Sequence, residues 1–290
     1  MIGDGIMRPR IGLILGGGAA RGYAHLGVLK KLKDEGITID FIIGASMGAL
    51  VGAAYSSKEN LDDLLNGAHE FGFFKFLTTM DIKVSRKGLI RGTKLEKHLE
   101  KFIKKDFNEL YIPMYIVATD VNTGKEIIFK EGDLIKAVRA SISIPFVFEP
   151  VEWFNTELID GSIVDFDVAF LAESLGADII IISDVSSNID MGMFTKIFSA
   201  INKKTKITDK AYKLNMLMPD MMSVTATTMK LLKENKEKKI TTRCSKPIYT
   251  IKSDVDNIKW YRFDKAEETI KKGEEAAENI IQEIKKISEI

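Results

Sequence analysis

The chain is poor in cysteine and histidine. Among its 290 residues, Cys244 is the single cysteine, and the three histidines are His25, His69 and His98. One cysteine cannot form an internal disulfide, which is typical of a protein in a reducing compartment. Because soft ligands are so few, the sequence argues against a zinc site, and we expect neither a metal nor a cofactor.

Charge of one sign and long apolar runs are also lacking. The 42 Lys and Arg residues nearly balance the 41 Asp and Glu residues, so no overall field would recruit nucleic acid. The apolar run Ile11–Leu15 is short and ends in glycines, whereas a membrane-spanning helix needs about 20 apolar residues. Residues 1–10 have neither the charged nor the apolar part of a signal peptide. We therefore expect a cytoplasmic protein whose contact with a membrane, where it has one, is peripheral.

Apolar runs alternate with helical patterns along the chain. Runs rich in Ile and Val without polar alternation indicate a parallel sheet that is covered by helices on both faces. Strands are expected at Ile11–Leu15, Ile39–Ile43, Met114–Ala118, Glu126–Phe129, Ala177–Ser183 and Ile248–Ile251. Helices are expected at Ala20–Glu35, Met47–Tyr55, Leu61–Phe71 and Thr93–Ile103, and from Asp264 to the end. The pattern predicts one α/β domain.

A chemical motif lies between the second expected strand and a helix of small residues. Residues 44–48 read GASMG and match G-x-S-x-G, with Gly44 and Gly48 on either side of Ser46. A sharp strand-to-helix turn strains the serine backbone, and the two glycines let neighbouring backbone approach closely. We therefore predict that Ser46 is a nucleophile; an ordinary glycine turn is the alternative.

Three consecutive glycines follow the first expected strand. Gly16, Gly17 and Gly18 precede Arg21 and the first expected helix. Consecutive glycines at a helix N-terminus expose N–H groups that can stabilise a phosphate or a developing oxyanion. A dinucleotide site is disfavoured because Arg21 stands at the third glycine position of G-x-G-x-x-G. A tight turn without a chemical role is the other alternative.

Ser46 has no evident histidine partner. In α/β-hydrolases the histidine follows the serine and the acid, but no histidine follows His98, and all three fit packed or surface positions in helices. The base is then a carboxylate acting directly on the serine. Asp160 is the candidate because it ends a short apolar run and precedes Gly161. Asp-Gly is also a common turn dipeptide, so a simple turn is the alternative.

In this order the three motifs resemble the patatin-like phospholipase family, especially its compact bacterial members, over about residues 11–183. Ser46 matches the family's nucleophile, and Asp160 matches its dyad partner in the motif D-G-G/A. Residues 139–145, RASISIP, match a further family block, R-A-S-x-S-I-P. One position departs from the pattern, since residue 162 is serine where the family has glycine or alanine. The resemblance implies a three-layer αβα fold around a mostly parallel sheet.

The resemblance also implies a serine acyl hydrolase that acts on lipid esters. Asp160 would accept the Ser46 proton, so we expect a buried site that raises the pKa of Asp160 above the ordinary value of about 3.9. The implied oxyanion residues are Gly16, Gly17, Gly18, Arg21 and Met47, with Arg21 either holding the loop or adding positive charge. A thioesterase or small-ester esterase would use the same residues, and a non-catalytic lipid-binding or regulatory protein would keep the fold. The sequence leaves the oligomeric state open.

Residues 190–246 differ from the rest in composition. They carry 13 basic against 5 acidic side chains and seven of the 12 methionines. We prefer a packed helical cap; the alternative is a lid or membrane contact, in which methionines meet acyl chains and lysines meet anionic headgroups. The predicted organisation is thus a single patatin-like domain. It comprises a core over 11–185, a helical basic insertion over 190–246, and a C-terminal strand and helix over 247–290.

Overall fold

The structure is a computed structural model, described over residues 8–58, 61–67, 92–145, 147–164, 167–185 and 243–288. Within these residues one eight-stranded sheet has the order β5-β6-β3-β2-β1-β7-β8, with β4 paired to β3. The strands are β1 (Ile11–Leu15), β2 (Phe41–Ala45), β3 (Met114–Asp120), β4 (Glu126–Phe129), β5 (Val151–Trp153), β6 (Thr156–Asp160), β7 (Ile179–Asp184) and β8 (Ile248–Lys252). The pairings that join β3, β2, β1, β7 and β8 are parallel, whereas those of β4, β5 and β6 are antiparallel.

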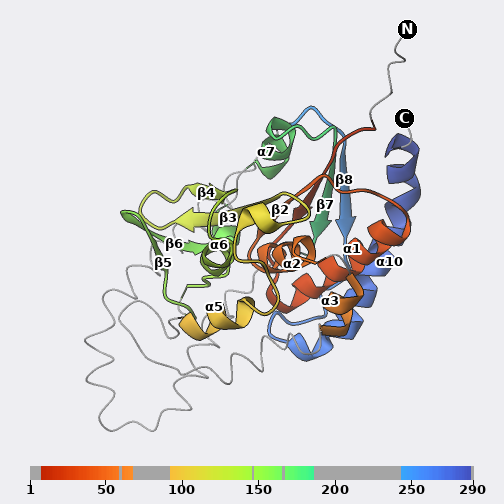
Figure 1. The fold of residues 1–290 in the computed structure, drawn as a ribbon. Coiled ribbons are helices and arrows are strands. Elements are labelled where there is room, and N and C mark those ends of the chain that lie inside the picture. Colours follow the sequence, from red (N-terminus) through yellow and green to blue (C-terminus); the bar gives the residue numbers. More distant parts are fainter. Residues whose placement is uncertain are drawn as a thin grey trace.

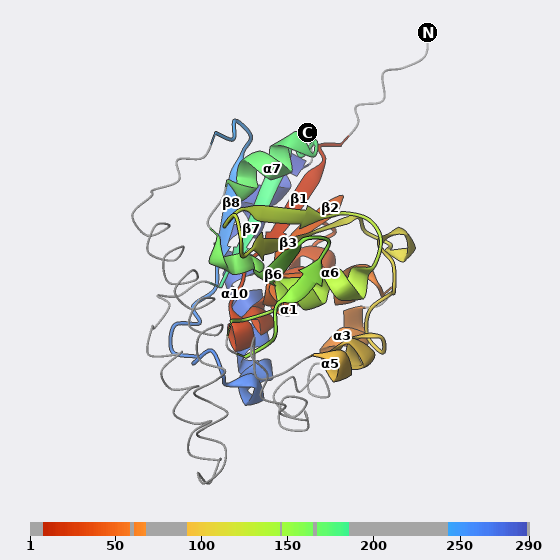
Figure 2. The ribbon, with the colours of Figure 1, turned by 90° about the vertical axis from the view of Figure 1, so that its left-hand side faces the viewer.

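Helices cover both faces of the sheet. They are α1 (Ala24–Asp34), α2 (Met47–Ser56), α3 (Leu61–Gly67), α5 (Thr93–Leu99), α6 (Leu134–Ser141), α7 (Val168–Ser174) and α10 (Ala266–Ser288), with short 3-10 helices at Ala19–Tyr23, Phe107–Glu109, Gly161–Ile163 and Phe263–Lys265. Both views show α1 and α10 lying side by side, with α7 apart from them (Figure 1 and Figure 2). None of the helices among the described residues is long and apolar enough to cross a membrane.

Side chains of the central strands alternate between two hydrophobic clusters. In β1, Leu13 and Leu15 belong to the large cluster that includes α1, α2 and α10, whereas Ile14 packs in a smaller cluster with α7. In β7, Ile181 and Ile180 divide in the same way. The strands are therefore buried on both faces, as their unbroken apolar sequences predict. The three-layer αβα expectation is confirmed.

Glycines allow α10 to lie very close to α1. A Cβ at Gly27 of α1 would lie 1.9 Å from the carbonyl oxygen of Ile270, and one at Gly273 of α10 would lie 2.0 Å from that of Ala24. Ala277 and Ile281 of α10 are fully buried in the large cluster. The C-terminal helix is thus part of the core and not an appendage.

Several expected boundaries shift. The second strand begins at Phe41 and not at Ile39, because Ile37 and Ile39 are buried as loop residues outside the ladder. The first helix starts with a 3-10 turn at Ala19–Tyr23. The sequence did not predict α6 and α7, although aspartates cap both: Asp133 accepts the N–H of Lys136 at 2.8 Å, and Asp167 accepts that of Phe170 at 3.0 Å.

Part of the predicted organisation falls outside the described residues. Of the basic insertion expected at 190–246, residues 190–242 lie outside the described part of the chain. His69 and the end of the helix expected at Leu61–Phe71 lie outside it as well. The division into core, insertion and C-terminal part, and the membrane contact of the insertion, therefore stay predictions.

Candidate active site

Ser46 occupies the turn between β2 and α2. Its φ of 52° and ψ of −124° lie in a region that is strained for a residue with a side chain. The turn is packed too closely for side chains at the flanking glycines. A Cβ at Gly44 would lie 2.8 Å from the Cα of Ala49, and one at Gly48 would lie 2.1 Å from the carbonyl oxygen of Leu15. The strained strand-to-helix turn that the motif predicts is therefore present.

The structure brings Ser46 and Asp160 together. Ser46 Oγ donates a hydrogen bond of 2.6 Å to Asp160 Oδ2, and the two residues are 6% and 3% exposed. Asp160 ends β6, which pairs antiparallel with β3 so that Asp160 lies opposite Ala118, while Ala45 of β2 lies opposite Val117 of the same strand. The ends of β2 and β6 thus lie on either side of β3, at neighbouring positions in the middle of that strand.

Burial raises the pKa of Asp160, and desolvation is the largest cause. Hydrogen bonds that favour the carboxylate oppose this rise: Oδ1 accepts from the hydroxyl of Ser162 at 2.6 Å and from its N–H at 2.8 Å, and Oδ2 accepts from Ser46. The net rise makes Asp160 a stronger base than an exposed aspartate. Asp160 is thus a buried carboxylate, as expected.

Ser141 supports the nucleophile turn, a contact that the sequence did not reveal. Its Oγ accepts the backbone N–H of Ser46 at 2.9 Å and donates to the carbonyl oxygen of Val117 at 2.6 Å. The N–H of Ser46 is therefore already engaged, whereas Met47 donates no backbone hydrogen bond to any residue in the described part of the chain. The signal was the family block over 139–145, to which the sequence could assign no contact.

Arg139 holds the same block in place. It is 1% exposed, and it donates from Nη1 to Ser143 Oγ at 2.5 Å and from Nη2 to the carbonyl oxygen of Glu149 at 3.0 Å. Its guanidinium also lies over the ring of Phe148. Since the backbone carbonyl oxygen of Ser143 accepts the N–H of Asp160 at 3.0 Å, this buried network reaches the Ser46–Asp160 pair.

The glycine loop lies against the Ser46–Asp160 pair. A Cβ at Gly17 would come within 2.6 Å of the Cβ of Ser162 and 3.1 Å of the Cβ of Ser46, so only glycine fits there. Gly17 and Gly18 donate no backbone hydrogen bond to another described residue, whereas the N–H of Gly16 lies 3.5 Å from the carbonyl oxygen of Ser183. N–H groups that lie beside the Ser46 hydroxyl without an acceptor among the described residues are suited to stabilise a negatively charged oxygen.

His25 is a packed helix residue, as expected, and it also contacts the glycine loop. It is fully buried, with Nε2 2.8 Å from the carbonyl oxygen of Gly16 and Nδ1 2.8 Å from Ser183 Oγ. Because a carbonyl only accepts, Nε2 carries the proton and Nδ1 accepts from the Ser183 hydroxyl. Burial lowers the pKa of His25 to about 4, so the ring is neutral at neutral pH.

Arg21 extends from the loop to the C-terminal part of the chain. Its Nε donates to the carbonyl oxygen of Ile258 at 2.6 Å, and the neighbouring Ala20 N–H donates to that of Trp260 at 2.9 Å. Ala20 and Arg21 thus tie the glycine loop to the segment between β8 and α10.

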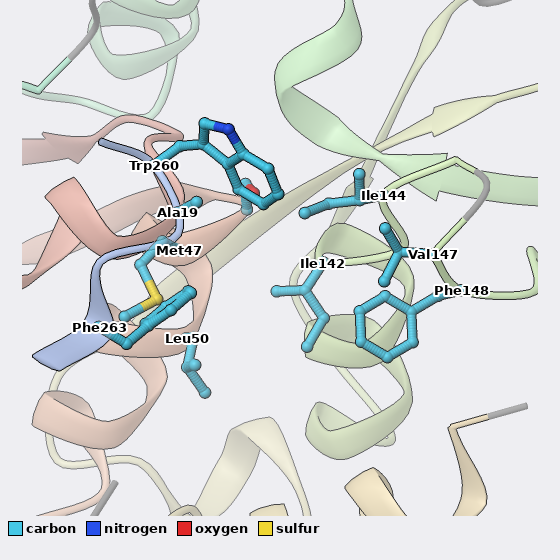
Figure 3. Close-up of a pocket in the computed structure, with 10 residues that line it drawn as sticks. Ala19, Met47, Leu50, Ile142, Ile144, Val147, Phe148, Trp260 and Phe263 are labelled. Carbon is cyan, nitrogen blue, oxygen red and sulfur yellow. The ribbon is translucent and has the colours of Figure 1, made fainter. Parts of the chain in front are cut away.

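An apolar slot opens beside Ser46 (Figure 3). Ser46 is the single polar residue among the described residues that line it. The others are Ala19, Met47, Leu50, Ile142, Ile144, Val147, Phe148, Trp260 and Phe263. Ala19, Met47, Trp260 and Phe263 form one side of the view, and the residues that face them are Ile142, Ile144, Val147 and Phe148.

A family model described as patatin-like phospholipase matches residues 13–172. The chain belongs to this family. An uncharacterized NTE family protein of Mycobacterium tuberculosis is 38% identical over 162 residues, which cover 56% of this chain and 45% of that protein. Neuropathy target esterase sws of Drosophila melanogaster is 34% identical over 188 residues, 62% of this chain and 13% of that protein.

Among solved structures, VipD from Legionella pneumophila matches with a TM-score of 0.44 and 12% identity, covering 96% of this chain and 67% of that one. This patatin-like chain spans less than half the length of the curated relatives described above. The family match includes the glycine loop, Ser46 and Asp160, but it ends before Trp260 and Phe263 of the slot.

Proposed function

We propose that this protein is a serine acyl hydrolase that cleaves carboxylic esters of lipids, including phospholipids, through a Ser46–Asp160 dyad. The observation that carries the proposal is the 2.6 Å hydrogen bond from Ser46 Oγ to a buried carboxylate, made from a strained turn. Membership in the patatin-like phospholipase family and the apolar slot beside Ser46 support the choice of lipid esters.

The first step acylates the enzyme. As Ser46 Oγ attacks the ester carbonyl carbon, its proton moves to Asp160 Oδ2. The carbonyl oxygen takes up negative charge, which the N–H groups of Gly17, Gly18 and Met47 stabilise. The tetrahedral intermediate then expels the alcohol oxygen, which takes the proton from Asp160. The products of this step are a free alcohol and an ester between the acyl group and Ser46.

The second step restores the enzyme. Water gives a proton to Asp160 and attacks the acyl-enzyme carbonyl, and Ser46 leaves as the same proton returns to its oxygen. The remaining two residues of the proposed oxyanion set act indirectly. Gly16 contributes through its carbonyl group, which His25 holds, and Arg21 holds the loop against the C-terminal segment.

The dyad makes a direct prediction about two variants. Ser46→Ala should lower kcat on a soluble ester by a factor on the order of 10⁴ or more, and Asp160→Asn should do nearly as much. A fluorophosphonate probe should label the wild type but not Ser46→Ala. Hydrolysis assays with purified variants, checked for folding by circular dichroism, measure this.

The competing functions give different results in the same assays. A Ser46→Ala variant that the probe still labels at its wild-type level removes the serine from the mechanism. An Asp160→Asn variant with wild-type kcat removes the dyad. A thioesterase or small-ester esterase would prefer acyl thioesters or acetyl esters to phospholipids. A non-catalytic lipid-binding protein would bind phospholipid and release no fatty acid.

A further inference from the structure

The apolar slot has two walls of different origin. Ile142, Ile144 and Phe148 follow α6 and lie within the part of the chain that the family model matches. Trp260 and Phe263 lie between β8 and α10, outside that match. Figure 3 shows these two aromatic side chains on the opposite side of the slot from Ile142, Ile144 and Phe148.

The C-terminal wall is fixed to the glycine loop. The carbonyl oxygen of Trp260 accepts the N–H of Ala20 at 2.9 Å, and that of Ile258 accepts Nε of Arg21 at 2.6 Å. The ring of Phe263 meets that of Tyr23 edge to face, with centroids 6.1 Å apart. Residues 258–263 therefore have a fixed position relative to Ser46, although they are distant in sequence.

Burial gives the slot a mouth and a floor. Trp260, Ile144 and Val147 are half-buried, whereas Leu50 and Phe263 are buried. Leu50 lies four residues after Ser46 on α2, which places it about one helical turn further along the same face. The slot therefore leads from the Ser46 hydroxyl into an apolar interior.

The chemistry of the lining selects one kind of ligand. No charged side chain is among the described residues that line the slot, so a phosphate or ammonium headgroup would lose its hydration there without a partner. An unbranched hydrocarbon chain has no polar group to desolvate, and each methylene that it buries favours binding about fourfold. One end of such a chain would lie at Ser46 Oγ, where an ester carbonyl has to be placed.

We propose that the slot binds the acyl chain of the ester that Ser46 attacks, and that Trp260 and Phe263 set the chain length it accepts. The proposal rests on the acyl hydrolase function proposed above. In this proposal Trp260 and Phe263, which lie outside the family match, select among substrates, whereas the matched residues carry out the reaction.

A series of p-nitrophenyl esters with acetyl, butyryl, octanoyl, dodecanoyl and palmitoyl chains tests this with the full chain. In the wild type, kcat/KM should rise from acetyl by about fourfold per methylene until the chain reaches the floor. Trp260→Ala should lower kcat/KM for the preferred long ester by about tenfold more than for the acetyl ester, mainly through KM. Phe263→Leu, which shortens the floor side chain, should move the preference to a longer ester.

The matched control is Tyr111→Ala. Tyr111 is an exposed aromatic residue, and its N–H bonds the carbonyl oxygen of Ser56, at the end of α2 opposite to Ser46. This variant should keep the wild-type profile.

If Trp260→Ala and Phe263→Leu also keep the wild-type chain-length profile while Ser46→Ala is inactive on every ester, the chain-length proposal is wrong and the hydrolase function stands. A Ser46→Ala variant with wild-type rates on every ester contradicts the proposed function itself. Trp260 is half-buried, so Trp260→Ala tests the chain-length proposal even where Phe263→Leu fails to fold.

Discussion

At the scale of single residues, Ser162 gives the carboxylate of Asp160 a feature of its own. The motif D-G-G/A has no hydroxyl at this position, whereas here Ser162 Oγ and the N–H of the same residue both bond Oδ1. Oδ1 is thereby occupied, and Oδ2 is the oxygen that faces Ser46. Ser162 is thus a positioning residue for the base, and it also stabilises the ionised form.

Ser162→Ala should change the pH dependence of hydrolysis. Loss of the hydroxyl bond removes one cause that lowers the pKa of Asp160, so this pKa rises further above its ordinary value. A general base must be unprotonated, so the acid limb of the kcat/KM profile should move to higher pH, with a several-fold loss of rate at low pH. At pH values well above the acid limb, the rates of Ser162→Ala should equal or exceed those of the wild type. The control is Ser174→Ala, since Ser174 Oγ bonds only the helix carbonyl of Leu171 among the described residues. An unmoved acid limb in Ser162→Ala would mean that the hydroxyl does not tune the base.

Sequence motifs identified the reacting residues but not their supports. Ser46 and Asp160 were recognisable because G-x-S-x-G and the shortage of histidine restrict the chemistry to a few side chains. Ser141 was not recognisable, because its role depends on the contacts that its hydroxyl makes with β3 and with the Ser46 turn in the folded chain. No local pattern encodes which of several serines will accept one particular N–H group.

At the scale of elements, His25 links α1 to the ends of β1 and β7. It bonds the carbonyl oxygen of Gly16 and the hydroxyl of Ser183 while fully buried. The C=O of Gly16 and the N–H of Gly17 belong to one planar trans peptide and point in opposite directions. By holding the carbonyl, His25 fixes the direction of the Gly17 N–H, which we propose as an oxyanion donor.

His25→Ala should lower kcat by roughly tenfold to a hundredfold, somewhat less than the loss of an entire oxyanion donor. KM for a short ester should change little, because the slot is untouched. His25→Gln, whose amide N–H can reach the same carbonyl, should recover part of kcat, and this rescue distinguishes positioning from simple loss of packing. Steady-state kinetics on the butyryl ester give both values; equal loss in the two variants, with KM raised as well, would contradict the positioning role.

The same residue predicts a pH dependence of stability. The pKa of His25 is about 4 in the folded protein against an ordinary 6.5, so between these values the unfolded chain binds the proton more readily. Its contribution is fully present above pH 6.5 and is lost as the pH falls towards 4. Urea unfolding of His25→Gln should therefore lose less stability over this interval than the wild type.

The sequence predicted strands with apolar runs better than the short strand β5. The strands β1 and β4 were predicted with their observed bounds, and β3 and β7 nearly so, because apolar runs rich in Ile mark them. By contrast, the expected elements did not include β5 (Val151–Trp153), a strand of three residues that has an exposed Glu152 at its centre. So short a strand depends on its pairing with β6, and a non-local pairing leaves no trace in local composition.

At the scale of the whole molecule, α10 connects the C-terminal segment to the core. It packs on α1 through Gly27 and Gly273, and it follows directly on the residues that form one wall of the slot. Ion pairs such as that of Lys30 with Glu274, at 3.0 Å, lie at the rim of this contact. Because both side chains are about one-third exposed, such a pair adds less than about 1 kcal/mol to the free energy of unfolding. The close approach of the two backbones, more than these ion pairs, therefore determines how α10 packs on α1.

Gly273→Ala tests this arrangement by the sign of its effect. Within a solvated helix, replacing glycine by alanine stabilises by about 1 kcal/mol. Here the new Cβ would lie 2.0 Å from the carbonyl oxygen of Ala24, so α10 has to move away from α1. We expect the free energy of unfolding to fall by roughly 1 to 3 kcal/mol in urea titrations, as overpacked sites do. Glu275→Ala, at an exposed position of the same helix, is the matched control and should change stability by less than about 0.5 kcal/mol. Stabilisation by Gly273→Ala would show that the two helices do not approach so closely.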